Sequence, residues 1–106
     1  MNKLKEMIIN GRSIGPAYPP YIIAELSANH NGDINRAFKI MEEAKKAGAD
    51  AIKLQTYTHE TITMDCDSEE FQIHGGLWDG QSLYALYKGA HMRWEWHKPL
   101  FDKAKE

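Results

Sequence analysis

The chain has 106 residues, of which 42% are hydrophobic and 26% charged, with a formal net charge of −2. These values are typical of one folded domain rather than a disordered chain. Thirteen basic residues against fifteen acidic ones leave no basic surplus for a nucleic acid, and no apolar run approaches the ~20 residues that span a bilayer. The single cysteine, Cys66, cannot form an internal disulfide, and no signal peptide is visible, so we expect a cytoplasmic protein.

The first predicted element is a β-hairpin over residues 7–14. Asn10 and Gly11 stand between two short apolar runs, which is the strongest local signal for a two-residue hairpin turn. Residues 15–20 contain a glycine and three prolines and interrupt regular structure.

A strand, a helix and a second strand are predicted next. Residues 21–25 are a short apolar run typical of a buried strand, and residues 50–56 form a similar run. Between them, Asp33 is a candidate N-cap of a helix with helical apolar spacing, and Gly48 is its candidate C′ residue. This order predicts a βαβ unit with parallel strands and a right-handed crossover.

The rest of the chain is predicted to be an excursion followed by helices. Residues 57–76 are rich in Thr, Asp and Glu, with a short helical turn expected at 68–71. Residues 82–90 and 94–105 have helical patterns, the second of which requires Pro99 to lie in its first turn. The sequence stops in this helical pattern with no cap, which we interpret as a helix cut in the middle.

Side-chain alternation divides the two strands into an apolar and a polar face. The helix should cover the apolar side chains, namely Ile22, Ala24, Ile52 and Leu54. Glu25, Lys53 and Gln55 then share the opposite face. Inside a closed barrel such charges are costly unless they are paired or bind a ligand. The alternative is that Glu25 and Lys53 form an ion pair with only a structural role.

The remaining candidate residues have simpler interpretations. His30 lies in a turn-like loop and is expected to form loop hydrogen bonds. His91 and His97 are six residues apart and so do not share a helical face, which argues against a metal pair. Cys66 has no adjacent base in the sequence and is expected to be an inert thiol.

Several segments together resemble a known family. Residues 22–32 (IIAELSANHNG) and 47–58 (AGADAIKLQTYT) resemble the opening of the phosphoenolpyruvate-dependent sialic acid synthases. Residues 75–87, which include GGLWDG and LYALY, and residues 94–97 (WEWH) are similar to the pseudaminate-forming branch rather than the N-acetylneuraminate branch. The resemblance covers residues 7–106, and its specificity comes from four motifs in order. One departure is Met92-Arg93, where related sequences often have Thr-Pro, and this leaves the local helix start open.

The resemblance implies an α/β fold that is the N-terminal part of a (β/α)8 TIM barrel. Residues 1–106 would supply an N-terminal hairpin, the first two parallel strands and the flanking helices. The remainder of the barrel and a C-terminal antifreeze-like domain would be absent, because a barrel needs ~250 residues.

The activity implied is the condensation of phosphoenolpyruvate with 2,4-diacetamido-2,4,6-trideoxy-altropyranose to give pseudaminic acid and phosphate. Glu25 matches the family's catalytic carboxylate of strand one. Lys53 matches the lysine that contacts phosphoenolpyruvate, and Gln55 matches a residue near the sugar. The family implies a divalent metal, Mn²⁺ or Mg²⁺, with ligands outside this chain, and a homodimer at full length.

Two alternatives are kept. The first is a synthase for N-acetylneuraminate or legionaminate, which shares the chemistry and differs in the sugar. The second is a non-catalytic, truncated fragment that folds poorly because its strand edges and apolar side chains are left uncovered.

Overall fold

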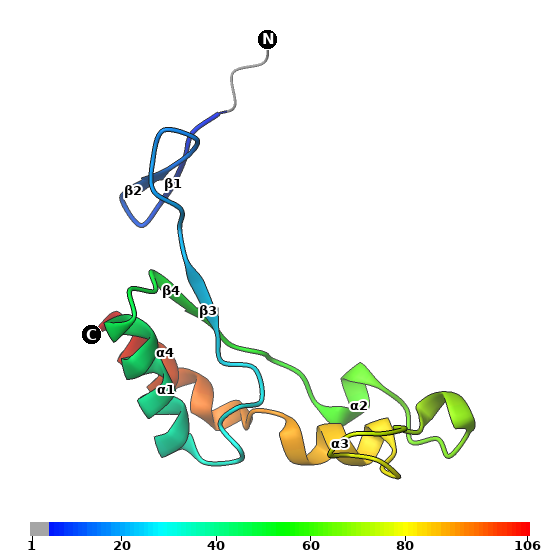
Figure 1. Ribbon diagram of the computed structural model, residues 1–106. Coiled ribbons are helices and arrows are strands. Elements are labelled where there is room, and N and C mark those ends of the chain that lie inside the picture. Colours follow the sequence, from blue (N-terminus) through cyan, green and yellow to red (C-terminus); the bar gives the residue numbers. More distant parts are fainter. Residues whose placement is uncertain (1–4) are drawn as a thin grey trace.

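The structure is a computed structural model that describes residues 5–106. The helices and strands of these residues form an open, curved arrangement and do not close into a barrel (Figure 1). The elements in chain order are β1 (Met7–Ile9), β2 (Arg12–Ile14), β3 (Ile23–Glu25), α1 (Ile34–Lys46), β4 (Ala51–Lys53), α2 (His59–Ile62), the 3₁₀ turn η1 (Glu69–Phe71), α3 (Leu83–Ala90), the 3₁₀ turn η2 (Trp94–Trp96) and α4 (His97–Lys105).

The predicted hairpin is confirmed. β1 and β2 pair antiparallel with Met7 opposite Ile14 and Ile9 opposite Arg12. Asn10 and Gly11 have φ values of 49° and 79°, the left-handed conformation that a type I′ turn requires at both central positions.

Two polar side chains join this hairpin to the start of the parallel strands. The Arg12 guanidinium donates to the Asp50 carboxylate and, at 3.2 Å, to the carbonyl of Pro20. The second carboxylate oxygen of Asp50 accepts the backbone N–H of Ile22 at 2.8 Å. The hairpin is therefore tied to the N-terminal ends of β3 and β4.

The predicted strand–helix–strand order with parallel strands is also confirmed, but β4 (Ala51–Lys53) is shorter than the predicted second strand over residues 50–56. β3 and β4 are parallel, with Ile23 opposite Ala51 and Glu25 opposite Lys53, and α1 connects them. The Asp33 side chain accepts the backbone N–H of Asn35 at 2.9 Å at the start of α1. Gly48 follows its C-terminus with φ of 98°, a conformation that glycine adopts without a Cβ penalty.

The core lies on one side of this two-stranded sheet. Its buried side chains are Leu26, Ala37, Met41, Met92, Trp96 and Leu100. Ile52 and Leu54 pack against this cluster, as the alternation predicts, and α1 and α4 lie side by side over it (Figure 1).

The expectation of a buried first strand over residues 21–25 is wrong in extent and in exposure. β3 contains three residues, and Ile22 and Ile23 are 49% and 54% exposed. Ile22 precedes the first paired residue, and its N–H is bound to Asp50 at the end of the sheet. Ile23 lies on the face opposite the helices, where residues 5–106 provide no second layer.

The excursion has more structure than predicted. The turn η1 is confirmed, whereas the four-residue helix α2 was not predicted. Thr58 at its start donates its backbone N–H to the Thr61 hydroxyl at 2.9 Å. This helix has no apolar repeat. The sequence feature that could have predicted it is the Thr58–Thr61 pair, which forms a capping box at its start. α3 follows the prediction, with the Ser82 hydroxyl accepting the N–H of Ala85 at 3.1 Å.

The last segment begins as a 3₁₀ turn and continues as α4, with Pro99 in the first helical turn as required. Met92, which stands where the sequences that this chain resembles often have threonine, is buried in the core. Arg93 precedes η2 without a side-chain capping bond.

The radius of gyration is 17.9 Å, whereas a compact domain of this length has ~13 Å. Among residues 5–106, no helix has both the length and the apolar content needed to cross a bilayer.

Candidate functional site

An ion pair lies at the C-terminal ends of the two parallel strands. Glu25 is the last residue of β3 and Lys53 the last residue of β4, and the two are register partners. The Lys53 Nζ donates to Glu25 Oε1 at 2.9 Å. The sequence prediction that these two side chains share one face is confirmed.

Both side chains point away from the helical layer. Their register neighbours Ala24 and Ile52 occupy the other face, where Ile52 packs on the core. The Glu25 and Lys53 side chains are 60% and 59% exposed. An exposed ion pair contributes little to stability.

Gln55 lies two residues beyond β4 and is exposed. Continued alternation beyond β4 predicts the same face as Lys53 for the Gln55 side chain. No hydrogen bond joins the Gln55 side chain to Glu25 or Lys53 among the residues that the structure describes.

Two residues next to this site were not recognised from the sequence as partners. Thr56 Oγ1 lies 2.6 Å from His97 Nε2, and His97 Nδ1 lies 2.7 Å from the carbonyl oxygen of Trp94. Thr56 and His97 are 41 positions apart, and no local pattern relates them.

His30 is in the loop that follows β3, and its expected loop hydrogen bond is confirmed. The backbone N–H of Gly32 donates to His30 Nδ1 at 3.0 Å. The side chain is 1% exposed, and its Nε2 has no hydrogen-bond partner among residues 5–106. Burial lowers the pKa of His30, and the nearby His91 lowers it further.

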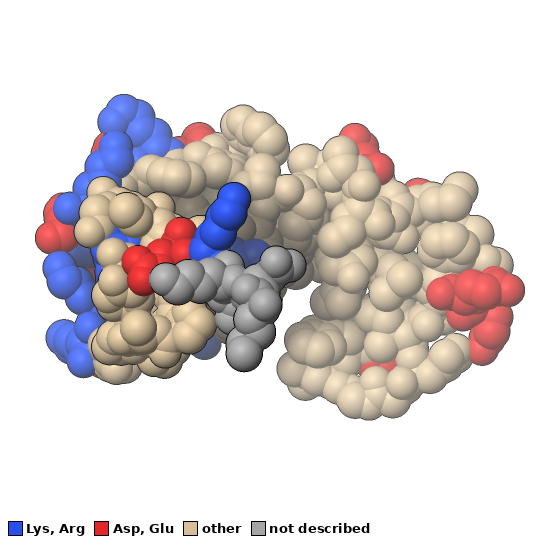
Figure 2. Space-filling model, turned by 90° about the horizontal axis from the view of Figure 1, so that it is seen from above, with Lys and Arg blue, Asp and Glu red and all other residues tan. Residues whose placement is uncertain are grey.

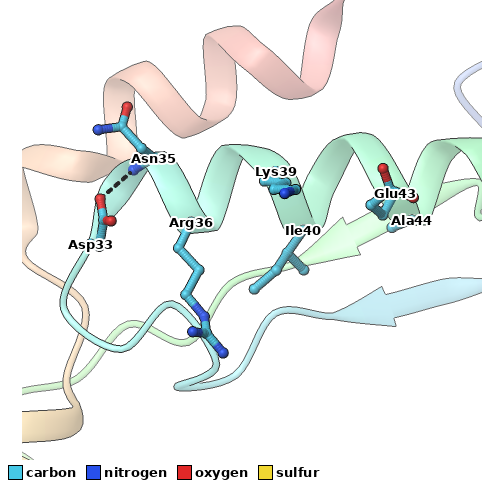
Figure 3. Close-up of a pocket in the computed structure, with 7 residues that line it drawn as sticks. All are labelled: Asp33, Asn35, Arg36, Lys39, Ile40, Glu43 and Ala44. Carbon is cyan, nitrogen blue, oxygen red and sulfur yellow. Dashed lines mark hydrogen bonds between the residues drawn. The ribbon is translucent and has the colours of Figure 1, made fainter.

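A shallow hollow runs along α1 (Figure 3). Its lining residues all come from α1 or its cap: Asp33, Asn35, Arg36, Lys39, Ile40, Glu43 and Ala44. In Figure 3, Arg36 points toward the loop after β3, where it donates to the carbonyl of Asn29 at 2.8 Å. This hollow includes neither Glu25 nor Lys53.

The charged side chains do not form an uninterrupted basic surface. Figure 2 shows Lys and Arg gathered mainly over the helical side of the molecule, with carboxylates among them. Three of these lysines, Lys46, Lys98 and Lys103, pair with Glu43, Asp102 and Glu42. This intermixed charge is typical of solvated helix faces.

Comparisons with known proteins identify relatives of the chain. The NeuB family model matches residues 40–106. The chain is 55% identical over 84 residues to a pseudaminic acid synthase of Campylobacter jejuni, covering 79% of this chain and 24% of that protein. It is 48% identical over 88 residues to the pseudaminic acid synthase of Helicobacter pylori, covering 83% and 26%.

More distant relatives extend the match. The N,N'-diacetyllegionaminic acid synthase of Legionella pneumophila is 33% identical over 98 residues, covering 91% of this chain and 27% of that protein. The crystal structure of the spore coat polysaccharide biosynthesis protein SpsE from Bacillus subtilis superposes with a TM-score of 0.62 at 29% identity, covering 95% of this chain and 25% of that one. The chain thus spans about a quarter of the length of the relatives it matches.

Proposed function

The chain belongs to the NeuB family, and from this we propose that it is the N-terminal part of a phosphoenolpyruvate-dependent synthase that forms pseudaminic acid. Its α/β fold with parallel strands corresponds to the N-terminal part of a TIM barrel in this family. The whole reaction would join phosphoenolpyruvate to 2,4-diacetamido-2,4,6-trideoxy-altropyranose and release phosphate.

The Glu25–Lys53 pair is the observation that carries this proposal. Lys53 presents a compact ammonium group at the C-terminal end of a parallel strand, which is where barrel enzymes build their active sites. Such a cation suits the carboxylate or phosphate of phosphoenolpyruvate. In the proposed complex the anionic substrate would take up part of the Lys53 charge that Glu25 now neutralises.

The proposed reaction assigns a task to each residue. The enol carbon C3 of phosphoenolpyruvate forms a bond to the aldehyde carbon of the sugar as the C=O π bond breaks. The aldehyde oxygen takes up a proton from water to become a hydroxyl, and C2 becomes cationic. Water adds to C2, the bond between C2 and the phosphate oxygen breaks, and a 2-keto acid remains. Glu25 would accept a proton from this water or stabilise the cation, while the Gln55 amide would hydrogen-bond the sugar.

The family also implies a divalent cation, Mn²⁺ or Mg²⁺, which when bound would polarise the sugar aldehyde as a Lewis acid. Residues 5–106 contain no group of three or more His, Cys, Asp or Glu side chains that could hold a metal ion. The described residues therefore do not fit this metal, and we propose that its ligands lie outside this chain.

We also propose that the complete protein continues with the rest of the barrel and an antifreeze-like domain and forms a homodimer in the cytoplasm. Ile22 and Ile23 are half exposed on an incomplete sheet, and further strands would cover them. The relatives are about four times longer than the part matched here.

The proposed sugar is supported by the sequence identities to the two kinds of synthase. The two pseudaminic acid synthases are 55% and 48% identical to this chain, whereas the legionaminic acid synthase is 33% identical. An N-acetylneuraminate or legionaminate synthase remains the alternative, because the bond-forming chemistry is the same.

The test uses the purified full-length protein that carries this chain. Phosphate release would be measured with phosphoenolpyruvate, a divalent metal and each of three sugars: the altro-configured diacetamido sugar and the substrates for legionaminate and N-acetylneuraminate. We expect the highest kcat/KM for the altro-configured sugar. A preference for another sugar would leave the synthase class intact and reject the pseudaminate assignment, and no phosphate release with any of them would reject the class.

A further inference from the structure

The segment directly after β4 contacts the first residue of α4 on its helical side. Leu54 packs against the core cluster, and the backbone N–H of Leu26 donates to the carbonyl of Lys53 at 3.0 Å. Thr56 lies 2.6 Å from His97 Nε2 through its hydroxyl. Residues on both sides of Gln55 are therefore fixed by contacts with the helical layer.

The tautomer of the neutral His97 ring follows from its hydrogen-bond partners. A carbonyl oxygen only accepts hydrogen bonds, so Nδ1 carries the hydrogen that is shared with the Trp94 carbonyl at 2.7 Å. In the neutral ring Nε2 is then left as an acceptor, and the Thr56 hydroxyl donates to it. The ring is held in one tautomer and one orientation.

The His97 ring is itself attached to a rigid part of the molecule. It is the first residue of α4, directly after Trp96, and Trp96 and Leu100 belong to the buried core. The indole of Trp94 lies against it, with ring centroids 5.1 Å apart. The hydrogen bond from Thr56 to this ring therefore fixes the segment after β4 relative to the buried core.

Alternation determines what this bond positions. Ile52 and Leu54 pack on the helical layer, and Thr56 reaches His97 in the same layer. Lys53 lies on the opposite face with Glu25, and Gln55 follows in the same phase. With Leu54 and Thr56 held on the helical side, alternation predicts that the Gln55 side chain faces the side of the ion pair.

We propose that His97 and Thr56 are positioning residues that act through Gln55 and set the affinity of the site for its amino sugar. The inference rests on the proposed function, since it takes Gln55 as the sugar contact. Lys53 is anchored separately by strand pairing with β3, so binding of phosphoenolpyruvate should be largely independent of the Thr56–His97 bond.

The experiment compares four single variants and one double variant of the full-length enzyme. Thr56→Val removes the hydroxyl at nearly constant volume and Thr56→Ser retains it. His97→Phe removes both ring nitrogens and His97→Gln keeps an acceptor near the position of Nε2. Steady-state phosphate release gives KM for the sugar, KM for phosphoenolpyruvate and kcat, and thermal melting checks the fold.

We expect Thr56→Val and His97→Phe to raise KM for the sugar about 5- to 10-fold, as the loss of one hydrogen bond predicts, with KM for phosphoenolpyruvate changed less than ~2-fold. Thr56→Ser and His97→Gln should recover most of the loss. The double variant Thr56→Val/His97→Phe should be no worse than His97→Phe, because both remove the same bond.

Three results would overturn the inference while leaving the synthase assignment in place. They are an unchanged KM for the sugar in Thr56→Val, equal losses in Thr56→Val and Thr56→Ser, and a parallel loss of kcat, both KM values and melting temperature. A wild-type enzyme without turnover would overturn the proposed function and this inference together.

Discussion

The ring of His30 meets the ring of Trp96 edge-on, with centroids 5.2 Å apart and planes at 85°. His30 belongs to the loop after β3, and Trp96 ends the turn η2. Both side chains are buried. This contact connects the exit of the first parallel strand to the helical segment that also holds the exit of the second through His97 and Thr56.

The burial of His30 predicts a loss of stability in acid. The pKa of His30 lies below its ordinary value of 6.5, first because burial disfavours the charged ring and second because His91 is near. Below this ordinary value the unfolded chain binds a proton that the folded chain does not. The stabilisation is therefore complete above about pH 6.5 and is lost as the pH falls toward the lowered pKa of the folded state.

The measurement is the midpoint of thermal unfolding of the full-length protein between about pH 7.5 and about pH 5.5. His30→Asn keeps a side-chain acceptor for the N–H of Gly32 and removes the titrating ring. We expect a smaller acid loss in this variant than in the wild type. An equal loss in both would show that other groups control the acid sensitivity.

Lys53 and Glu25 should matter for turnover far more than for stability. Lys53→Met removes the cation at similar length, and Glu25→Gln removes the negative charge at the same shape. We expect each to lower kcat/KM at least ~100-fold, because a charge aligned with the reacting atoms is lost. The melting temperature should change little, because the pair is largely exposed.

Lys45→Met is the matched control for Lys53→Met, because Lys45 is an exposed lysine on α1 outside the candidate site. It should leave kcat/KM at the wild-type value. Equal activities of the Lys53 and Lys45 variants would show that the Glu25–Lys53 pair has no role in turnover.

Asp50 should contribute to stability through the two donors it binds. Asp50→Ala leaves the Arg12 guanidinium and the N–H of Ile22 without this acceptor. Hydrogen bonds to charged groups contribute about 1.5–3 kcal/mol when buried, and partial exposure of both side chains reduces this. We expect a loss of about 1–2 kcal/mol in the free energy of unfolding, measured by urea denaturation of the full-length protein.

Glu43→Ala serves as the comparison for Asp50→Ala, because Glu43 also forms an ion pair but with the exposed Lys46. It should leave stability almost unchanged. If Asp50→Ala also left stability unchanged, the contacts between the hairpin and the sheet would not contribute to the free energy of unfolding.

Gly48, which follows α1, and Gly89, which lies within α3, should respond to alanine with opposite signs. A Cβ at Gly48 or Gly89 would meet no atom within 4 Å, so backbone conformation decides the result. Gly48 has φ of 98°, and Gly48→Ala should destabilise the protein by roughly 1–2 kcal/mol. Gly89 lies within α3, and Gly89→Ala should stabilise it by up to ~1 kcal/mol. Urea midpoints that shift in the same direction for both would contradict this argument.

The 106-residue chain by itself should lack turnover and fold poorly. Each strand of its parallel sheet has three residues, and its radius of gyration of 17.9 Å exceeds the ~13 Å of a compact domain. Circular dichroism during heating, with phosphate release measured in parallel, tests this expectation. A cooperative transition together with turnover would contradict it.

Local chemistry explains the elements that were predictable from the sequence. The hairpin turn depends on the local conformations of Asn10 and Gly11. The ends of α1 depend on the Asp33 cap and on Gly48, which both act within about one helical turn. The alternation of β3 and β4 likewise predicted that Glu25 and Lys53 share a face. These features need only the backbone preferences and side-chain spacing of short segments.

Only the tertiary structure decided which distant groups meet. The Thr56–His97 hydrogen bond joins residues 41 positions apart, and His30 packs on Trp96; neither contact has a signature in local spacing. Exposure was equally non-local, since Ile22 and Ile23 have the composition of a buried strand but are half exposed, because burial depends on what the rest of the fold places over a side chain. Spacing along a strand determines which face a residue occupies, whereas its partners on that face depend on how the helices pack.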